Sequence, residues 1–135
     1  MKKITENTIE EFAIELLERL GYQYVYAPEI APDGERPERS SYGDVLLINR
    51  LRKAVSRINP ENNEFIVANQ FTVIENGNNK RADVIPFANG IPLAVIELKN
   101  PADENATVRS AYRQLQTYKE IIPILFTYIW FYGYL

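Results

Sequence analysis

Two carboxylates and one amine in the second half of the chain have the types and spacing of a metal-assisted hydrolytic site. Asp83 is followed by thirteen residues and then by Glu97, and Lys99 stands two positions further on. Side chains alternate across a strand, so Glu97 and Lys99 are predicted to share one face. Mg²⁺ binds a few carboxylates together with waters and phosphate oxygens. The pattern therefore indicates phosphodiester hydrolysis, in which Asp83 and Glu97 bind the ion, the backbone carbonyl of Leu98 adds an oxygen ligand, and Lys99 positions the attacking water.

The same residues also have a purely structural interpretation. A glutamate and a lysine two positions apart on a sheet face are common, and as a surface ion pair they contribute little. The residues before them favour a site instead, because positions 92–96 are apolar and predict an interior strand that the charges interrupt. Charged groups at the end of a buried strand frequently mark a functional site.

Composition removes several other kinds of chemistry. The chain has no cysteine and no histidine, which excludes disulfides, thiolate zinc sites and imidazole general bases, so any metal must be bound by oxygen. The formal net charge of -3 provides no overall basic field for binding DNA tightly and alone. A metal site concentrates carboxylates, however, and a partner subunit could supply the basic surface. No phosphate-binding loop motif is present, so no ATPase motor is expected in these residues.

Helical periodicity is clear in three segments. Thr5 is a plausible N-cap for the first helix and Gly21 its end, while Pro123 must end the third. The expected helices are residues 5–20, 41–58 and 106–121.

Runs of β-branched and aromatic residues separated by turn signals predict the strands. Asn76-Gly77 and Asn89-Gly90 are expected to be tight turns, residues 28–41 a loop and residues 59–63 a turn cluster. Because only a short connection joins residues 81–87 to residues 92–99, these two strands should be antiparallel neighbours. The expected strands are residues 22–27, 64–75, 81–87, 92–99 and, as a buried strand too short to cross a bilayer as a helix, 124–135.

The motif residues resemble a known family. Asp83 and the later Glu97-Leu98-Lys99 resemble the PD-(D/E)xK nuclease motif, with Ala82 in place of its proline. Residues 69–73, 81–84 and 90–101 are similar to the N-terminal nuclease domain of type I restriction enzyme R subunits, and the resemblance covers most of residues 4–128. It implies an α/β fold of the restriction-endonuclease-like type, with a central mixed sheet flanked by helices, and Mg²⁺-dependent cleavage of DNA.

The resemblance adds three residues to the expected site. Glu10, on the first helix, matches an acidic position of such nucleases and is a further expected metal ligand. Gln114 and Tyr118 match a Q-x-x-x-Y motif beside the active site, and their spacing puts both on one helical face. Each has an alternative: Glu10 is one of several charges on an exposed helix, and Tyr118 lies on an apolar stripe where a core tyrosine is expected.

The resemblance also implies partners and a larger context. Residues 1–135 would be a single nuclease domain, a fragment of an R subunit whose motor domains are absent from it. The R subunit would dock on methyltransferase and specificity subunits and cut double-stranded DNA after ATP-driven translocation. With no apolar signal-peptide core near the start, a cytoplasmic location is expected. Two alternatives stay open: an inactive nuclease-like module that only binds a partner, and an independent small nuclease of the junction-resolving or repair kind.

Three departures from the family pattern are present. Only a short Asn-rich turn precedes the strand at residues 64–75, where family members carry a longer stretch. Pro86 removes a ladder hydrogen bond and is expected to distort the strand near Asp83, which would loosen a metal site there. Residues 129–135 differ from the family sequence.

Overall fold

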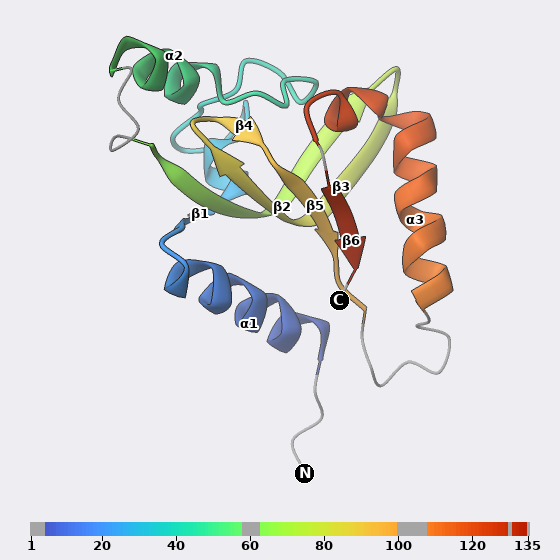
Figure 1. Cartoon of the computed structure of the whole chain (residues 1–135). Coiled ribbons are helices and arrows are strands. Elements are labelled where there is room, and N and C mark those ends of the chain that lie inside the picture. Colours follow the sequence, from blue (N-terminus) through green and yellow to red (C-terminus); the bar gives the residue numbers. More distant parts are fainter. Residues whose placement is uncertain (1–4, 58–62, 100–107, 130, 135) are drawn as a thin grey trace.

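A mixed β-sheet forms the centre of the computed structural model, and helices cover both of its faces (Figure 1). The structure describes residues 5–57, 63–99, 108–129 and the backbone of residues 131–134. The sheet order is β1-β2-β3-β5-β6, with β4 beside β3. The strands are β1 (Gln23–Tyr26), β2 (Phe65–Glu75), β3 (Asn78–Ala88), β4 (Ile91–Pro92), β5 (Ala94–Glu97) and β6 (Phe131–Tyr134). This architecture confirms the expected α/β fold with a mixed sheet.

Helix α1 (Glu6–Arg19) covers one face of the sheet and matches the sequence prediction closely. Thr5 caps it, because its hydroxyl accepts a hydrogen bond from the Thr8 amide at 3.3 Å. Gly21 follows with φ +94, the left-handed conformation common at helix ends. Only Ala13 and Ile14 are buried along the helix. The apolar cluster between α1 and the sheet contains Ile14, Val67, Val84 and Leu98.

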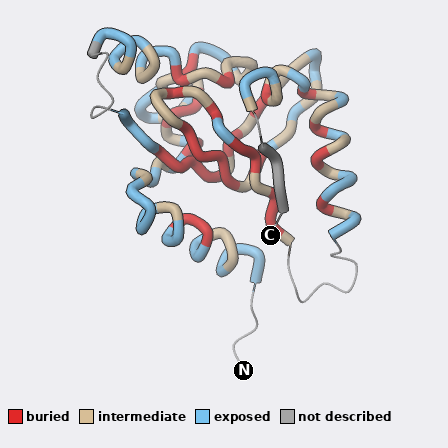
Figure 2. Tube along the Cα trace, in the orientation of Figure 1, coloured by how far each residue is buried: buried red, intermediate tan, exposed pale blue. Residues whose placement is uncertain are grey.

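Helix α3 (Val108–Ile121) covers the opposite face, where the larger core lies. Figure 2 shows buried chain along the central strands and on the inner side of α3. Leu115, Tyr118 and Ile122 enter this core beside Phe71 and Phe87, whose ring centroids lie 5.4 Å apart. The described part of the predicted helix, from residue 108, is confirmed. It ends before Pro123, which cannot donate the next helical hydrogen bond.

Helix α2 (Ile48–Arg57) is shorter than the predicted helix over residues 41–58, and its last predicted residue lies outside the described ranges. Arg39, only 4% exposed, explains the late start. Its guanidinium donates to the carbonyls of Tyr42, Asp44 and Thr72 at 2.7–2.8 Å, and burial lowers its pKa to about 10. The Asp44 carboxylate in turn accepts the amides of Ser40 and Ser41. These side-chain bonds occupy backbone groups that a helix would need.

The predicted strand over residues 92–99 is divided into β4 and β5. Pairing with β3 shifts by one residue between them, and the amide of Leu93 donates to the Pro86 carbonyl at 2.8 Å. Pro86 has no amide hydrogen to donate to the neighbouring strand, and the shift opposite it is a local distortion of the kind expected. The loosening of a metal site that this distortion would cause stays a prediction. The β2–β3 turn fits the prediction, with Asn76 at φ +50 and Gly77 at φ +78.

The prediction of one buried strand over residues 124–135 is wrong in its first part. Pro123 opens a short 3₁₀ helix, η3 (Pro123–Phe126), whose Leu125 is fully buried. Proline fixes a φ suited to the first position of such a turn. A strand does form further on, where β6 pairs in parallel with β5. A second 3₁₀ helix, η1 (Ala27–Ile30), begins the segment that was expected to be loop. No described helix is both long and apolar enough to cross a membrane.

The turn between β3 and β4 provides a test of packing. Gly90 has φ +83, and a Cβ there would lie 2.3 Å from the Leu47 carbonyl oxygen at the start of α2. We expect Gly90→Ala to lower the free energy of unfolding by about 3 kcal/mol, measured by urea denaturation. Gly77→Ala is the matched control, because Gly77 has a similar φ of +78 and open space around it. Backbone strain alone should lower the free energy of unfolding of Gly77→Ala by about 1 kcal/mol. Equal losses of stability in Gly77→Ala and Gly90→Ala would contradict the predicted clash.

Candidate active site

The side-chain alternation of β2 and β3 changes at one facing pair, Gln70 and Asp83. The ladder includes Asn69 with Val84 and Phe71 with Ala82 but skips the pair between them, and Gln70 has φ +58. The larger core takes residues 66, 68, 71 and 73 from β2 and residues 82, 85 and 87 from β3. We call this reversal of side-chain alternation the break at Gln70. Because of it, both strands contribute core residues before and after the pair, while Asp83 faces the cleft beside α1.

Asp83 and Glu97 lie on neighbouring antiparallel strands, one step along the ladder from the paired residues Val84 and Ile96. Asp83 Oδ2 accepts a hydrogen bond from the Leu98 amide at 2.8 Å. Burial raises the pKa of Asp83, and this hydrogen bond opposes the rise. The predicted antiparallel arrangement and the proximity of these two carboxylates are thus present.

Glu97 is fully buried, which is unusual for a carboxylate. Burial, and then the nearby charge of Asp83, raises its pKa to about 8. Its Oε1 lacks a hydrogen-bond partner of good geometry among the described residues. Glu97 is therefore held in an environment that disfavours its own charge unless a cation compensates for it.

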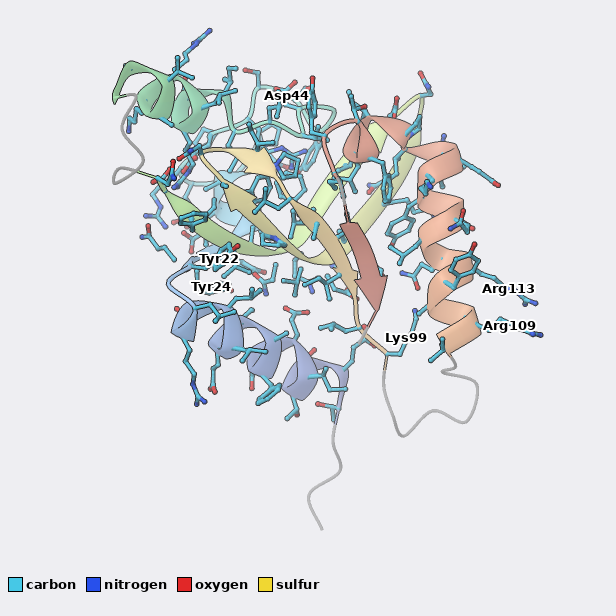
Figure 3. All side chains as sticks on the ribbon, in the orientation of Figure 1. Tyr22, Tyr24, Asp44, Lys99, Arg109 and Arg113 are labelled. Atoms are coloured by element: carbon cyan, nitrogen blue, oxygen red, sulfur yellow. The ribbon has the colours of Figure 1, made fainter. Side chains whose placement is uncertain are left out.

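Gln114 on α3 connects Glu97 to Lys99. Its Oε1 accepts a hydrogen bond from Lys99 Nζ, and its Nε2 donates to Glu97 Oε2 and, at 2.9 Å, to the Tyr118 hydroxyl. Figure 3 shows Lys99 beyond the end of β5, pointing toward α3. The Tyr118 hydroxyl donates to the Arg81 carbonyl at 3.2 Å. Burial and the charge of Glu97 raise the pKa of Tyr118 to about 12, so it stays a neutral hydroxyl.

Glu10 reaches the site from the other side of the sheet, across a cleft of about 690 Å³ between α1 and the strands. Its carboxylate accepts hydrogen bonds from the side-chain amides of Asn69 and Gln70, the latter at 2.7 Å. Its charge contributes to the raised pKa of Asp83. The described residues contain no cluster of three acidic side chains close enough to hold one ion. Glu10 thus faces the same cleft as Asp83 without closing a three-carboxylate cage.

The residues at this place fit a hard divalent cation. Two adjacent carboxylates supply oxygen ligands, and Oε1 of Glu97 is a buried acceptor without a donor in the described part of the chain. Mg²⁺ takes few protein carboxylates and keeps positions for water and phosphate. The chemistry of the donor set is therefore oxygen-based, as the absence of cysteine and histidine requires.

Sequence comparison agrees with this arrangement. Residues 3–134 match the family model described as type I restriction enzyme R protein N terminus. The chain belongs to this family. The match to the R-protein N-terminus family extends over nearly all of the chain and includes every residue of the site.

Two relatives extend the comparison. The putative type I restriction enzyme MjaIXP endonuclease subunit of Methanocaldococcus jannaschii is 31% identical over 190 positions, and the type I restriction enzyme HindI endonuclease subunit of Haemophilus influenzae is 26% identical over 186. Each alignment covers 93% of this chain but only 18% of the relative. Because both alignments are longer than the 135 residues of this chain, the relatives carry additional residues within the aligned region.

The structure brings together Asp83, Glu97, Lys99, Gln114 and Tyr118, all of which the sequence had singled out. Leu98 lies beside them with its side chain buried against α1. Sequence reasoning did not assign Asn69, Gln70 or Tyr24, although two polar residues in the middle of an apolar strand were a visible signal. Asn69 is 7% exposed and accepts a hydrogen bond from the Tyr24 hydroxyl at 2.9 Å.

The raised pKa of Glu97 predicts how stability depends on pH. Between pH 4.5 and about 8 the folded state keeps a proton that the unfolded state has lost, so Glu97 lowers stability as pH rises through this window. We compare the free energy of unfolding of Glu97→Gln with that of wild type, both without divalent metal. We expect this difference to shift in favour of the variant by roughly 2–4 kcal/mol when the pH is raised from 4.5 to 8.5. Urea denaturation at both pH values measures this. Glu18→Gln, on the exposed side of α1, should show no such gain, and a pH-independent difference for Glu97→Gln would rule out the shift.

Proposed function

We propose that this chain hydrolyses DNA phosphodiester bonds with Mg²⁺, as the nuclease part of a type I restriction enzyme. The observation that carries the proposal is the meeting of Asp83 and Glu97 at one point, with Lys99 joined to Glu97 through the single side chain of Gln114. Two carboxylates and an amine at the end of a buried sheet are the parts that metal-assisted hydrolysis needs. The family membership favours a phosphodiester of DNA as the substrate.

Asp83 and Glu97 would hold the ion, and the Leu98 carbonyl and Glu10 are further candidate oxygen ligands. The chemistry that a divalent ion supplies when bound here is polarisation of a phosphoryl oxygen and activation of a water molecule. The Leu98 amide fixes one oxygen of Asp83, which leaves the other oxygen for the ion. Deprotonation of Glu97 must accompany binding, since a carboxylate binds metal in its charged form.

Lys99 supplies the positive charge next to the reacting phosphate. Its amine donates a hydrogen bond to the Gln114 carbonyl oxygen, which keeps it beside Glu97. The amine would orient the attacking water or stabilise negative charge that develops on the phosphoryl group. Gln114 keeps its amide orientation because its nitrogen donates to Glu97 and Tyr118, and Tyr118 is anchored in turn to the backbone of β3.

The wider assembly is part of the proposal. The chain spans about 18% of the length of the relatives it matches, which are named as endonuclease subunits of type I restriction enzymes. We propose that this nuclease works in the cytoplasm with methyltransferase and specificity subunits and with an ATP-driven motor that bring double-stranded DNA to it. A net charge of -3 and a glutamate-rich cleft agree with delivery of DNA by partners.

A plasmid-nicking assay with Mg²⁺ tests the chemistry. We expect Lys99→Ala to lower the nicking rate by at least about 100-fold, because the charge that faces the phosphate is lost. Lys53→Ala removes a lysine from the exposed side of α2 and should leave the rate unchanged. Chelation of Mg²⁺ with EDTA should abolish nicking by the wild-type protein and by Lys53→Ala. A Lys99→Ala protein as active as wild type would refute the proposed mechanism.

Metal binding separates this function from that of an inactive partner-binding module. We expect calorimetry to detect Mn²⁺ binding to the wild-type chain and about a 100-fold loss of affinity in Asp83→Asn, because a charged ligand is removed. Glu18→Gln, an exposed residue of α1 that does not line the cleft, is the control and should bind as wild type does. No metal binding by the wild type would favour the inactive module.

A further inference from the structure

Glu10 is held by the side chains of two consecutive residues of β2, which a regular strand cannot provide. Consecutive side chains of a strand point to opposite faces of the sheet. Asn69 and Gln70 nevertheless both donate their amide N–H groups to the Glu10 carboxylate, one to each of its oxygens. The left-handed φ of +58 at Gln70 is what turns both amides to the same side.

This backbone conformation has a cost that a regular strand does not carry. A non-glycine residue in the left-handed region is strained by about 1–2 kcal/mol. The β2–β3 register is the same on both sides of Gln70, so the strain does not serve to insert or remove a residue. Residues strained in this way cluster at functional sites. Here the strained residue faces Asp83 across the ladder and contacts Glu10.

Tyr24 on β1 determines which atom of Asn69 faces Glu10. Its hydroxyl donates to Asn69 Oδ1 at 2.9 Å, so the Asn69 nitrogen must be the atom directed at the carboxylate. The opposite orientation would place an amide oxygen against a carboxylate oxygen. Figure 3 shows Tyr24 on the side of the sheet that α1 covers.

The donors to Glu10 are neutral, and this is important for a cation site. Among the described residues Glu10 forms no ion pair with a lysine or arginine. Amide donors fix the position of a carboxylate without cancelling its negative charge, whereas a salt bridge would compete with a metal ion. The carboxylate thus stays available to the cleft that it shares with Asp83.

We propose that Tyr24, Asn69 and Gln70 are positioning residues that hold the Glu10 carboxylate at the metal site. The inference rests on the proposed function and extends it to three residues that would not touch the substrate. Tyr24 sets the orientation of the Asn69 amide, the break at Gln70 adds the second amide, and both fix Glu10 opposite Asp83. Glu10 then contributes its charge to the ion through a water of the ion's hydration shell.

Calorimetric titration of the full chain with Mn²⁺ tests the role of Tyr24. We expect Tyr24→Phe to weaken Mn²⁺ binding about tenfold, as outer partners of metal ligands typically do when removed. Tyr26→Phe is the matched control, because Tyr26 lies on the same strand and lines the same cleft, and the described residues give its hydroxyl no hydrogen bond. Its affinity should stay within about twofold of wild type. Equal affinities for the two variants would overturn the role of Tyr24.

Substitution of Gln70 separates positioning from structural support. Glycine adopts a φ of +58 without strain, so Gln70→Gly should fold with unchanged or higher stability in urea denaturation. The same variant lacks the amide and should bind Mn²⁺ about tenfold more weakly. A purely structural residue would give a loss of stability with unchanged metal affinity, and that result would overturn the inference.

Two further variants distinguish failure of this inference from failure of the proposed function. Asp83→Asn and Glu10→Gln should both weaken Mn²⁺ binding. If Asp83→Asn and Glu10→Gln weaken Mn²⁺ binding while Tyr24→Phe and Gln70→Gly bind as wild type does, the metal site is supported and the positioning role is wrong. If Asp83→Asn binds as wild type does, the proposed metal site is wrong, and the positioning role falls with it.

Discussion

Two carboxylates, Asp83 on β3 and Glu97 on β5, lie close together on neighbouring strands inside the sheet. The arrangement of the other site residues depends on this close approach. Loss of hydration opposes the ionisation of both carboxylates and raises the pKa of each, and the nearby charge of Asp83 raises the pKa of Glu97 further. The fold keeps them together because the β2–β3 hairpin and the neighbouring β5 are fixed by the core. The Leu98 amide and the Gln114 side chain stabilise one oxygen of each carboxylate. The unsatisfied oxygen of Glu97 is the part of this arrangement that the described residues do not compensate.

The precision of the site comes from the two helices that lie on opposite faces of the sheet. Helix α3 is anchored in the larger core by Leu115 and Tyr118, and this anchoring fixes Gln114 against Glu97 and Lys99. Helix α1 brings Glu10 to the other side, where the break at Gln70 receives it. The same break directs Asp83 out of the core. One local departure from strand geometry therefore serves both sides of the site.

Much of the fold and of the site could be predicted from the sequence, because the signals were local. Helix capping at Thr5, the Asn76-Gly77 turn and the apolar run before Glu97 each specify structure within a few residues. The late start of α2 could not be predicted, since it depends on Arg39 bonding to carbonyls that include one more than thirty residues away. The left-handed Gln70 was hidden for the same reason, because its side chain bonds to a carboxylate on another element. Glu10 was suggested by family resemblance, whereas the amides that hold it became visible only in three dimensions.

The unequal anchoring of the two helices has a consequence for how the protein loses its structure. Helix α1 buries only Ala13 and Ile14, and its residues Phe12 and Leu16 are largely exposed, as is Leu20 at its C-terminal cap. Proteins open in cooperative units whose local stability follows the apolar surface that each unit buries. Detachment of α1 should therefore precede global unfolding and remove Glu10 while the sheet and α3 remain assembled. Amide hydrogen exchange in α1 would then be faster than in the central strands, and the proposed ion would couple the two units through the charges of Glu10 and Asp83.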